Sequence, residues 1–208
     1  MTATITPIAN GPLVHVHRQA GATMEIVDGW EVAVGYPSKP QRGANTLIDL
    51  SHRKVNEFTG PQTGAAMRLL CGSESTVRAI HVSEDFEAYR LTDARAIVFG
   101  RANVSDAIDV TGGWSSLALF GPDVRTILNK ITALDLREQT LPAGHCCQGP
   151  IFGINALFGH FENRYELHVC PDVMQFLWEV TLDAGHEFQL RPAGLESYQQ
   201  ASGVKTSS

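Results

Sequence analysis

Two stretches of the sequence, "LIDLSHRKVNEFTGPQTGAAMRLL" at 47–70 and "AIDVTGGWSSLALFGPDVRTIL" at 107–128, follow the same plan. Each begins with an aspartate, continues as a strand-like run, reaches a Gly-Pro pair and then becomes helix-like. Proline suits the first position of a helix because its φ is fixed and it needs no amide hydrogen. Both stretches therefore predict a strand-to-helix joint, and the positions that correspond are Asp49 with Asp109, Gly60 with Gly121, and Met67 with Leu128.

Hairpins and one further helix are expected around these two stretches. Asp28-Gly29 separates two runs of strand formers, and this pair favours a tight type I′ turn because both residues need a positive φ. Further turns are expected at 92–94 and near Glu162-Asn163, and a helix is expected from Pro171 to Gly185. Strand–helix units that alternate with hairpins favour an α+β fold with mixed or antiparallel sheets.

The pattern also predicts how the chain is divided. We expect one α+β domain over 1–197, built from two related strand-helix-strand repeats at about 47–100 and 107–185. The last stretch, 198–208, is polar and is expected to form a disordered tail.

Composition excludes several classes of protein. The 208 residues are 43% apolar and 18% charged, as in soluble globular proteins, and the formal net charge is -6. The basic residues are scattered without the clusters that nucleic-acid binding needs, and no stretch approaches the roughly 20 apolar residues of a membrane span. We therefore expect a cytoplasmic protein whose four cysteines are reduced; Cys71 and Cys170 are the one pair left for a bridge, without support.

Several pieces in a fixed order resemble one known superfamily. They are "DVTGGWSSLALFGPDVRTILNKITALDL" at 109–136, "YELHV" at 165–169, "LWEVTLDAG" at 177–185 and "RPAGLES" at 191–197, and "DLSHRKVNEFTGP" at 49–61 looks like its opening segment. The order resembles the superfamily of the glycine-cleavage T-protein (aminomethyltransferase), which includes the small γ subunit of heterotetrameric sarcosine oxidase. This resemblance implies two related halves with tetrahydrofolate in a central opening, which would explain the repeat.

The resemblance also implies site residues. Glu166 corresponds to a glutamate that grips the pterin ring through paired hydrogen bonds. The catalytic aspartate of the family lies in a Gly-Gly-x-x-Asp-Asp segment, and Asp93 is the only, degraded match to it here. Trp114 could stack on a flat ligand, although a tryptophan that enters a strand is more often part of the core. Glu166 shares a strand face with His168, and that face could equally be exposed to solvent.

Beyond "PAGL" the family continues with an arginine-bearing helix and a barrel domain that this sequence does not show. The resemblance therefore implies a small non-catalytic or weakly catalytic subunit of a folate-linked, N-demethylating, sarcosine-oxidase-like flavoenzyme. Its partners would be larger flavoenzyme subunits or further copies of itself, and its possible cofactor is tetrahydrofolate or a related pterin. Two alternatives stay open: a free-standing tetrahydrofolate-dependent aminomethyl or methyl transferase, and a pterin-binding module without chemistry.

Other residue types with reactive side chains have simpler explanations. Zinc sites need pairs of ligands at short, regular spacings, which the histidines and cysteines between 145 and 170 lack, so no metal is expected. Asp49 and Asp109 are expected to begin their strands and to accept backbone hydrogen bonds in the preceding turn, a common role for aspartate before a strand.

Overall fold

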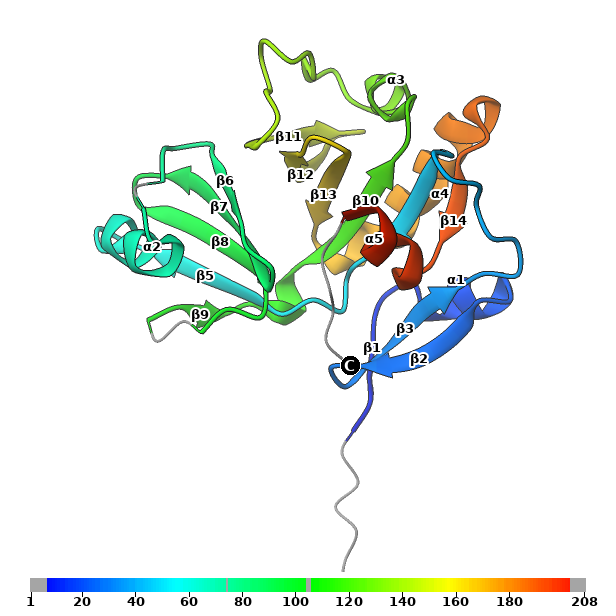
Figure 1. The fold of residues 1–208 in the computed structure, drawn as a ribbon, viewed down its shortest axis with the longest axis horizontal. Helices are drawn as coiled ribbons and strands as arrows, with labels where there is room; N and C mark the ends of the chain where they lie inside the picture. The colour runs from blue at the N-terminus through cyan, green and yellow to red at the C-terminus, as the bar shows by residue number, and fades with distance from the viewer. Residues whose placement is uncertain (1–6, 74, 104–105, 203–208) are drawn as a thin grey trace, which may run out of the picture.

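The two repeated stretches form equivalent parts of a fold with two halves (Figure 1). The computed structural model describes residues 7–73, 75–103 and 106–202. Each half consists of a first strand, a second strand, a helix and a three-stranded meander. The first half comprises β4 (Thr46–Asp49), β5 (Val55–Thr59), α2 (Thr63–Cys71), β6 (Ile80–Val82), β7 (Phe86–Thr92) and β8 (Arg95–Gly100). The second comprises β9 (Ile108–Asp109), η1 (Thr111–Gly113), β10 (Ser115–Phe120), α3 (Val124–Ile131), β11 (His145–Ile151), β12 (Ile154–His160) and β13 (Arg164–Val169).

The halves exchange their first strands. β4 pairs antiparallel with β10 of the second half, and β9 pairs antiparallel with β5 of the first half. The resulting six-stranded sheet has the order β11-β12-β13-β10-β4-β14, and the five-stranded sheet has the order β6-β7-β8-β5-β9. The predicted α+β fold, with two related repeats in mixed and antiparallel sheets, is confirmed.

The turns after the exchanged strands are built alike. Asp49 Oδ1 accepts hydrogen bonds from the amide and hydroxyl of Ser51 at 2.9 and 2.5 Å, and Asp109 Oδ1 accepts the same pair from Thr111 at 3.0 and 2.7 Å. The hydroxyls of Ser51 and Thr111 in turn accept an amide hydrogen from the opposite half at 3.2 and 3.0 Å. Both aspartates thus accept backbone hydrogen bonds as expected, but each one ends its strand and caps the turn that follows, so the expectation that they begin their strands is wrong.

Elements at both ends of the chain complete the fold. A small sheet of order β1-β3-β2 lies beside α1, and the C-terminal segment adds a helix, an edge strand and a last short helix (Figure 1). The predicted hairpin turn is present, since Asp28 and Gly29 have φ values of 52° and 80°. These elements are β1 (Ala9–Asn10), α1 (Val14–Gln19), β2 (Thr23–Val27), β3 (Trp30–Gly35), η2 (Pro171–Val173), α4 (Met174–Gly185), η3 (His186–Phe188), β14 (Arg191–Ala193) and α5 (Leu195–Ser202).

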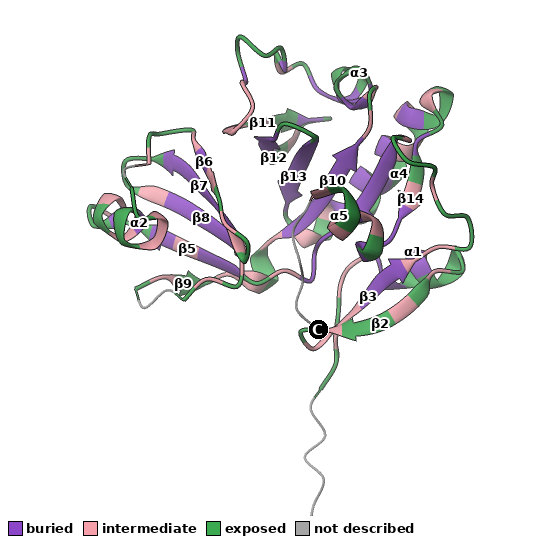
Figure 2. Ribbon diagram, in the orientation of Figure 1, coloured by how far each residue is buried: buried purple, intermediate pink, exposed green. Residues whose placement is uncertain are grey.

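Helices cover the outer faces of the two large sheets, and the inner faces meet. α2 packs on the five-stranded sheet through Met67, while α3 and α4 pack on the six-stranded sheet (Figure 2). Between the sheets, Tyr89 and Phe99 of one contact Leu157 and Phe161 of the other in a buried apolar cluster. Polar side chains placed between these inner faces are therefore shielded from water.

The C-terminal segment differs from the expected tail. α5 continues to Ser202 and Tyr198 is 4% exposed, so the stretch 198–202 is helical and its tyrosine is buried. Polar composition hid this because a single aromatic residue anchors the helix against Phe120, with ring centroids 5.8 Å apart. The rest of the expected tail, 203–208, lies outside the described residues, and the one-domain boundary stays a prediction.

Two further observations concern the expected environment of the chain. All four cysteines are free thiols in this structure, and their redox state stays a prediction. In the part of the chain that the structure describes, none of the helices has both the length and the apolar character that a membrane crossing requires.

Candidate functional site

Four charged side chains form a closed ring between the inner faces of the two sheets. Arg53 donates to Glu87 Oε2 at 2.6 Å and to Glu166 Oε2 at 2.7 Å. Arg164 donates to Glu166 Oε1 at 2.7 Å and to Glu87 Oε1 at 2.5 Å. We call these four residues the ion ring. Each half of the fold supplies one arginine and one glutamate, so two of the four ion pairs cross between the halves.

Two tyrosines and a histidine surround the ion ring. The Tyr198 hydroxyl, from α5, lies 3.1 Å from Oε1 of both Glu87 and Glu166. The Tyr89 hydroxyl donates to Glu166 Oε2 at 3.5 Å and lies 3.0 Å from Nε2 of His168. The other ring nitrogen of His168, Nδ1, lies 2.8 Å from the Ser116 hydroxyl, so both ring nitrogens have a hydrogen-bond partner.

Burial makes the charge state of these groups depend on one another. Burial alone would raise the pKa of Glu166, but the nearby charges of Arg53 and Arg164 outweigh it and lower that pKa to about 2. Burial and the charge of Glu166 raise the pKa of Glu87, with both arginines opposing this change. Burial lowers the pKa of His168 to about 3, so its imidazole is neutral. The ion ring is thus a matched set of charges rather than a group of independent acids.

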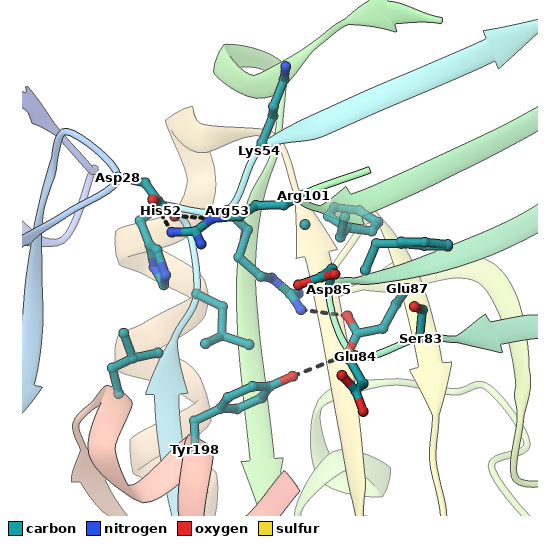
Figure 3. Close-up of a pocket in the computed structure, with 15 residues that line it drawn as sticks. Asp28, His52, Arg53, Lys54, Ser83, Glu84, Asp85, Glu87, Arg101 and Tyr198 are labelled. Carbon is teal, nitrogen blue, oxygen red and sulfur yellow. Dashed lines mark hydrogen bonds and ion pairs between the residues drawn. The ribbon is translucent and has the colours of Figure 1, made fainter. Parts of the chain in front are cut away.

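A small cleft with a volume of about 80 Å³ lies against one side of the ion ring (Figure 3). Arg53, Glu87 and Tyr198 reach its inner end, and Figure 3 shows Arg53 between Glu87 and the outer group of Asp28, His52 and Arg101. Arg101 forms an exposed ion pair with Asp28 at the mouth. Burial lowers the pKa of His52 to about 4, so this histidine lines the cleft in its neutral form. The cleft therefore gives solvent access to the outer side of Arg53.

Glu166 lies at the centre of this site but does not face the cleft. Its side chain is 0% exposed, and His168 beside it is equally buried. The alternative of a solvent-exposed strand face for these two residues is therefore wrong, because the five-stranded sheet covers that face. Whether Glu166 holds a pterin stays a prediction.

The other two predicted site residues lie apart from the ion ring. Trp114 follows η1, is partly buried and packs edge-to-face on Phe99 with centroids 6.1 Å apart. Asp93 lies in the exposed turn between β7 and β8, where its carbonyl accepts a hydrogen bond from Arg90 at 2.5 Å. It is six positions from Glu87 along the chain, which in an extended strand is a span of roughly 20 Å. The structure thus does not bring Asp93 to the ion ring, and its catalytic role stays a prediction.

Sequence reasoning missed four members of the site, which are Arg53, Glu87, Arg164 and Tyr198. Alternation along β13 could have placed Arg164 on the same face as Glu166, since the two are separated by one residue. Nothing in the local pattern marks Arg53 or Glu87, because their partners lie far away in the chain.

The histidines and cysteines between 145 and 170 also have defined places. His160 stacks on Tyr165 with centroids 4.2 Å apart, and its Nδ1 lies 2.8 Å from the Leu141 carbonyl. Within residues 7–73, 75–103 and 106–202, no three His, Cys, Asp or Glu side chains converge in a way that could hold a metal ion.

Aminomethyltransferases from other organisms align with most of this chain. The aminomethyltransferase of Streptomyces coelicolor is 29% identical over 228 aligned residues, which cover 91% of this chain and 61% of the relative. The aminomethyltransferase of Saccharopolyspora erythraea is 25% identical, with 88% of this chain and 60% of the relative covered. The chain therefore spans about three fifths of the length of these relatives.

Solved structures show the same fold. The glycine cleavage system aminomethyltransferase T from Bartonella henselae matches with a TM-score of 0.75 at 16% identity, over 96% of this chain and 64% of that one. A chain of the heterotetrameric sarcosine oxidase from Corynebacterium sp. U-96 matches with a TM-score of 0.66 at 14% identity, over 86% of this chain and 95% of that one. The model of the GCVT N-terminal domain matches residues 77–201. The resemblance to the T-protein superfamily is confirmed, and the chain belongs to the GCVT N-terminal domain family.

Proposed function

We propose that this chain is a non-catalytic subunit of a larger, folate-linked, N-demethylating flavoenzyme of the sarcosine oxidase type. The observation that carries the proposal is the state of Glu166, the carboxylate that the resemblance assigns to the pterin. Two arginines of the chain itself engage this carboxylate, and it is fully buried. Folate-dependent transfer needs a positioned carboxylate next to the reacting nitrogen, and Asp93, the only match to that acid, lies away from the ion ring.

The similarity to sarcosine oxidase supports the same proposal. The match covers 95% of one chain of a heterotetrameric enzyme, so a fold of this size serves there as one component of an assembly. Buried apolar contacts join the small sheet and α5 to the six-stranded sheet, and further buried contacts join the two halves, as expected for a structural component.

Purification from the organism that makes the protein tests this proposal. We expect the chain to elute at a fixed ratio with larger subunits whose absorption spectrum shows flavin, and to stay with them through a second, different column. Demethylation of a secondary amine such as sarcosine should follow the same fractions. A stable single chain that elutes without partners and without flavin would contradict the proposal.

The curated relatives favour the alternative of a tetrahydrofolate-dependent transferase, since those proteins are named aminomethyltransferases. In that case tetrahydrofolate should raise the melting temperature of the isolated chain, because a ligand that binds only the folded state stabilises it. Formation of methylenetetrahydrofolate by the isolated chain from an aminomethyl donor would establish this alternative.

A further inference from the structure

Both oxygens of the Glu166 carboxylate are already engaged by arginines of the chain itself, and the side chain is fully buried. A carboxylate offers about four lone-pair positions on its two oxygens. Oε1 accepts from Arg164 Nε at 2.7 Å and lies 3.1 Å from the Tyr198 hydroxyl, while Oε2 accepts from Arg53 Nη2 at 2.7 Å and from Tyr89 at 3.5 Å. A pterin would present its 2-amino group and ring N–H to these same two oxygens. The residues present therefore do not fit the cofactor that the family implies.

The arginines present paired N–H donors to the Glu166 carboxylate, as the pterin ring would. A guanidinium is planar and carries its N–H donors in a rigid fork, so it can replace a planar donor pair on a carboxylate. Two aromatic rings contact Arg164: its guanidinium carbon lies 3.7 Å from the Phe161 ring centroid and 5.5 Å from that of Tyr198. Arg53 lies 5.5 Å from the Phe99 ring centroid and forms the inner end of the cleft.

We infer that Arg53 and Arg164 permanently take up the oxygens of Glu166, the carboxylate that the resemblance assigns to the pterin. The ion ring then joins the two halves in place of a ligand. The inference deepens the proposed function and rests on it, since it explains how a subunit keeps this fold without folate at Glu166. Two predictions separate it from an ordinary buried salt bridge. The isolated chain should not bind tetrahydrofolate through Glu166, and a gap made at Arg53 should accept a free guanidinium compound.

Arg53 is the member to remove because its side chain is 12% exposed and lies against the cleft, so a probe from solvent can reach the gap. Arg53→Ala leaves two buried carboxylates short of one cation and should lower the melting temperature by about 8 °C or more. Methylguanidinium chloride at millimolar concentration should then restore at least about 3 °C of this loss. Methylammonium chloride at the same concentration should restore none of it, since its ammonium lacks the planar fork.

Arg95→Ala is the matched control. Arg95 pairs with Glu57 at 2.6 Å on the surface of the five-stranded sheet and is 39% exposed. Its loss should therefore change the melting temperature by less than about 3 °C. Neither this variant nor the wild type should respond to methylguanidinium. If Arg53→Ala melts within about 2 °C of Arg95→Ala, or if methylguanidinium and methylammonium act alike on it, the inference is wrong.

A second measurement on the wild-type chain decides the matter even if Arg53→Ala does not fold. Tetrahydrofolate is titrated while the melting temperature is followed, first for the wild type and then for Glu166→Gln. No shift for the wild type supports the inference, and a shift that Glu166→Gln leaves intact also does, since that ligand binds elsewhere. A wild-type shift that Glu166→Gln abolishes overturns it. Co-purification with flavin subunits is read separately, so either proposal can fail while the other stands.

Discussion

His168 is a fully buried histidine with a partner at each ring nitrogen, Ser116 on one side and Tyr89 on the other. Its neutral ring links the Ser116 side chain of β10 to the Tyr89 hydroxyl, which in turn contacts Glu166. A proton added to His168 would place a third cation beside Arg53 and Arg164, without water to solvate it. The folded state therefore resists protonation of this residue, and stability should depend on pH.

Acid should lower the free energy of unfolding, and His168 should account for part of this loss. Its pKa is about 3 in the folded chain against an ordinary value of 6.5, so between these pH values the unfolded chain binds a proton that the folded chain does not. The free energy of unfolding should therefore fall as pH is lowered from 6.5 toward 3. Each such proton contributes about 1.4 kcal/mol per pH unit. Urea unfolding of His168→Gln should show a slope that is shallower by about 1 kcal/mol per pH unit between pH 6 and 4.

Other groups make this comparison of slopes necessary. The lowered pKa values of Glu166 and His52 act in the same direction, while the raised pKa of Glu87 acts against them. Because these contributions remain in His168→Gln, only the difference from the wild type is assigned to His168. The exposed His186→Gln serves as a control, and identical slopes for wild type and His168→Gln would refute the prediction.

For single residues of the site, the sequence indicated at most one of the two partners in each interaction. Glu166 stood out only because "YELHV" resembles a family motif, and its buried setting was invisible since the covering strand, β7, lies far away in the chain. Nothing in the local sequence distinguished Arg53 from the other scattered basic residues. Tyr198 was assigned to a polar tail because five of its neighbours are polar or small, whereas its ring and hydroxyl are both used in the interior.

The Gly-Pro joints show how two equivalent elements can differ in their tolerance. Gly60 has φ 93° and Gly121 has φ 125°, both in the region that L side chains rarely adopt. A Cβ at Gly60 would meet no atom within 4 Å, whereas a Cβ at Gly121 would lie 2.2 Å from Asn45 Oδ1 and 2.7 Å from its Cα. Asn45 also donates to Asp123 at 2.9 Å at the start of α3, so it has little freedom to move.

The two joints should therefore respond unequally to the same substitution. Gly60→Ala should cost about 1–2 kcal/mol of unfolding free energy, the strain of a positive φ alone. Gly121→Ala adds a backbone clash and should cost about 4 kcal/mol or more. Urea denaturation of both variants and the wild type measures the difference, and each variant is the control for the other. Equal losses would show that the contact with Asn45 does not limit this position.

Elements that depend on local signals were predictable, and their pairing was not. The Gly-Pro pairs indicated the strand-to-helix joints, although α2 and α3 begin two residues after each proline, and Asp28-Gly29 correctly marked a hairpin. A positive φ or a missing amide is a property of the residue itself. The exchange of β4 and β9 between the halves had no such signal. An isolated run such as "TLID" does not encode which distant strand it will pair with.

For the molecule as a whole, the exchange means that neither half contains its own complete sheet. The hydroxyls of Thr111 and Ser51 each bind an amide of the opposite half, and these contacts join residues 56 and 65 positions apart in the chain. The ion ring adds two more links between the halves, through Arg53 with Glu166 and Arg164 with Glu87. Stability should therefore be shared by both halves rather than summed from two independent units.

Cutting the chain between the halves tests this sharing. Fragments 1–103 and 104–208 should each lack cooperative unfolding when studied alone, because each leaves a central strand without its neighbour. Mixed in equal amounts, they should recover the circular dichroism and the sharp melting transition of the intact chain. A fragment that unfolds cooperatively on its own, with a melting temperature close to that of the whole chain, would show that the exchange is not needed for stability.

The exchanged strands also set an order of events during synthesis on the ribosome. When β5 and its meander have emerged, the neighbour of β5 is a strand that has not yet been translated, and β4 waits for β10 in the same way. The first half must therefore keep two strand edges unpaired until the second half leaves the exit tunnel, and unpaired edges are where nascent chains associate wrongly. Slow translation between the two stretches would lengthen this exposure, so soluble yield should depend on codon choice there more than on codons after β13.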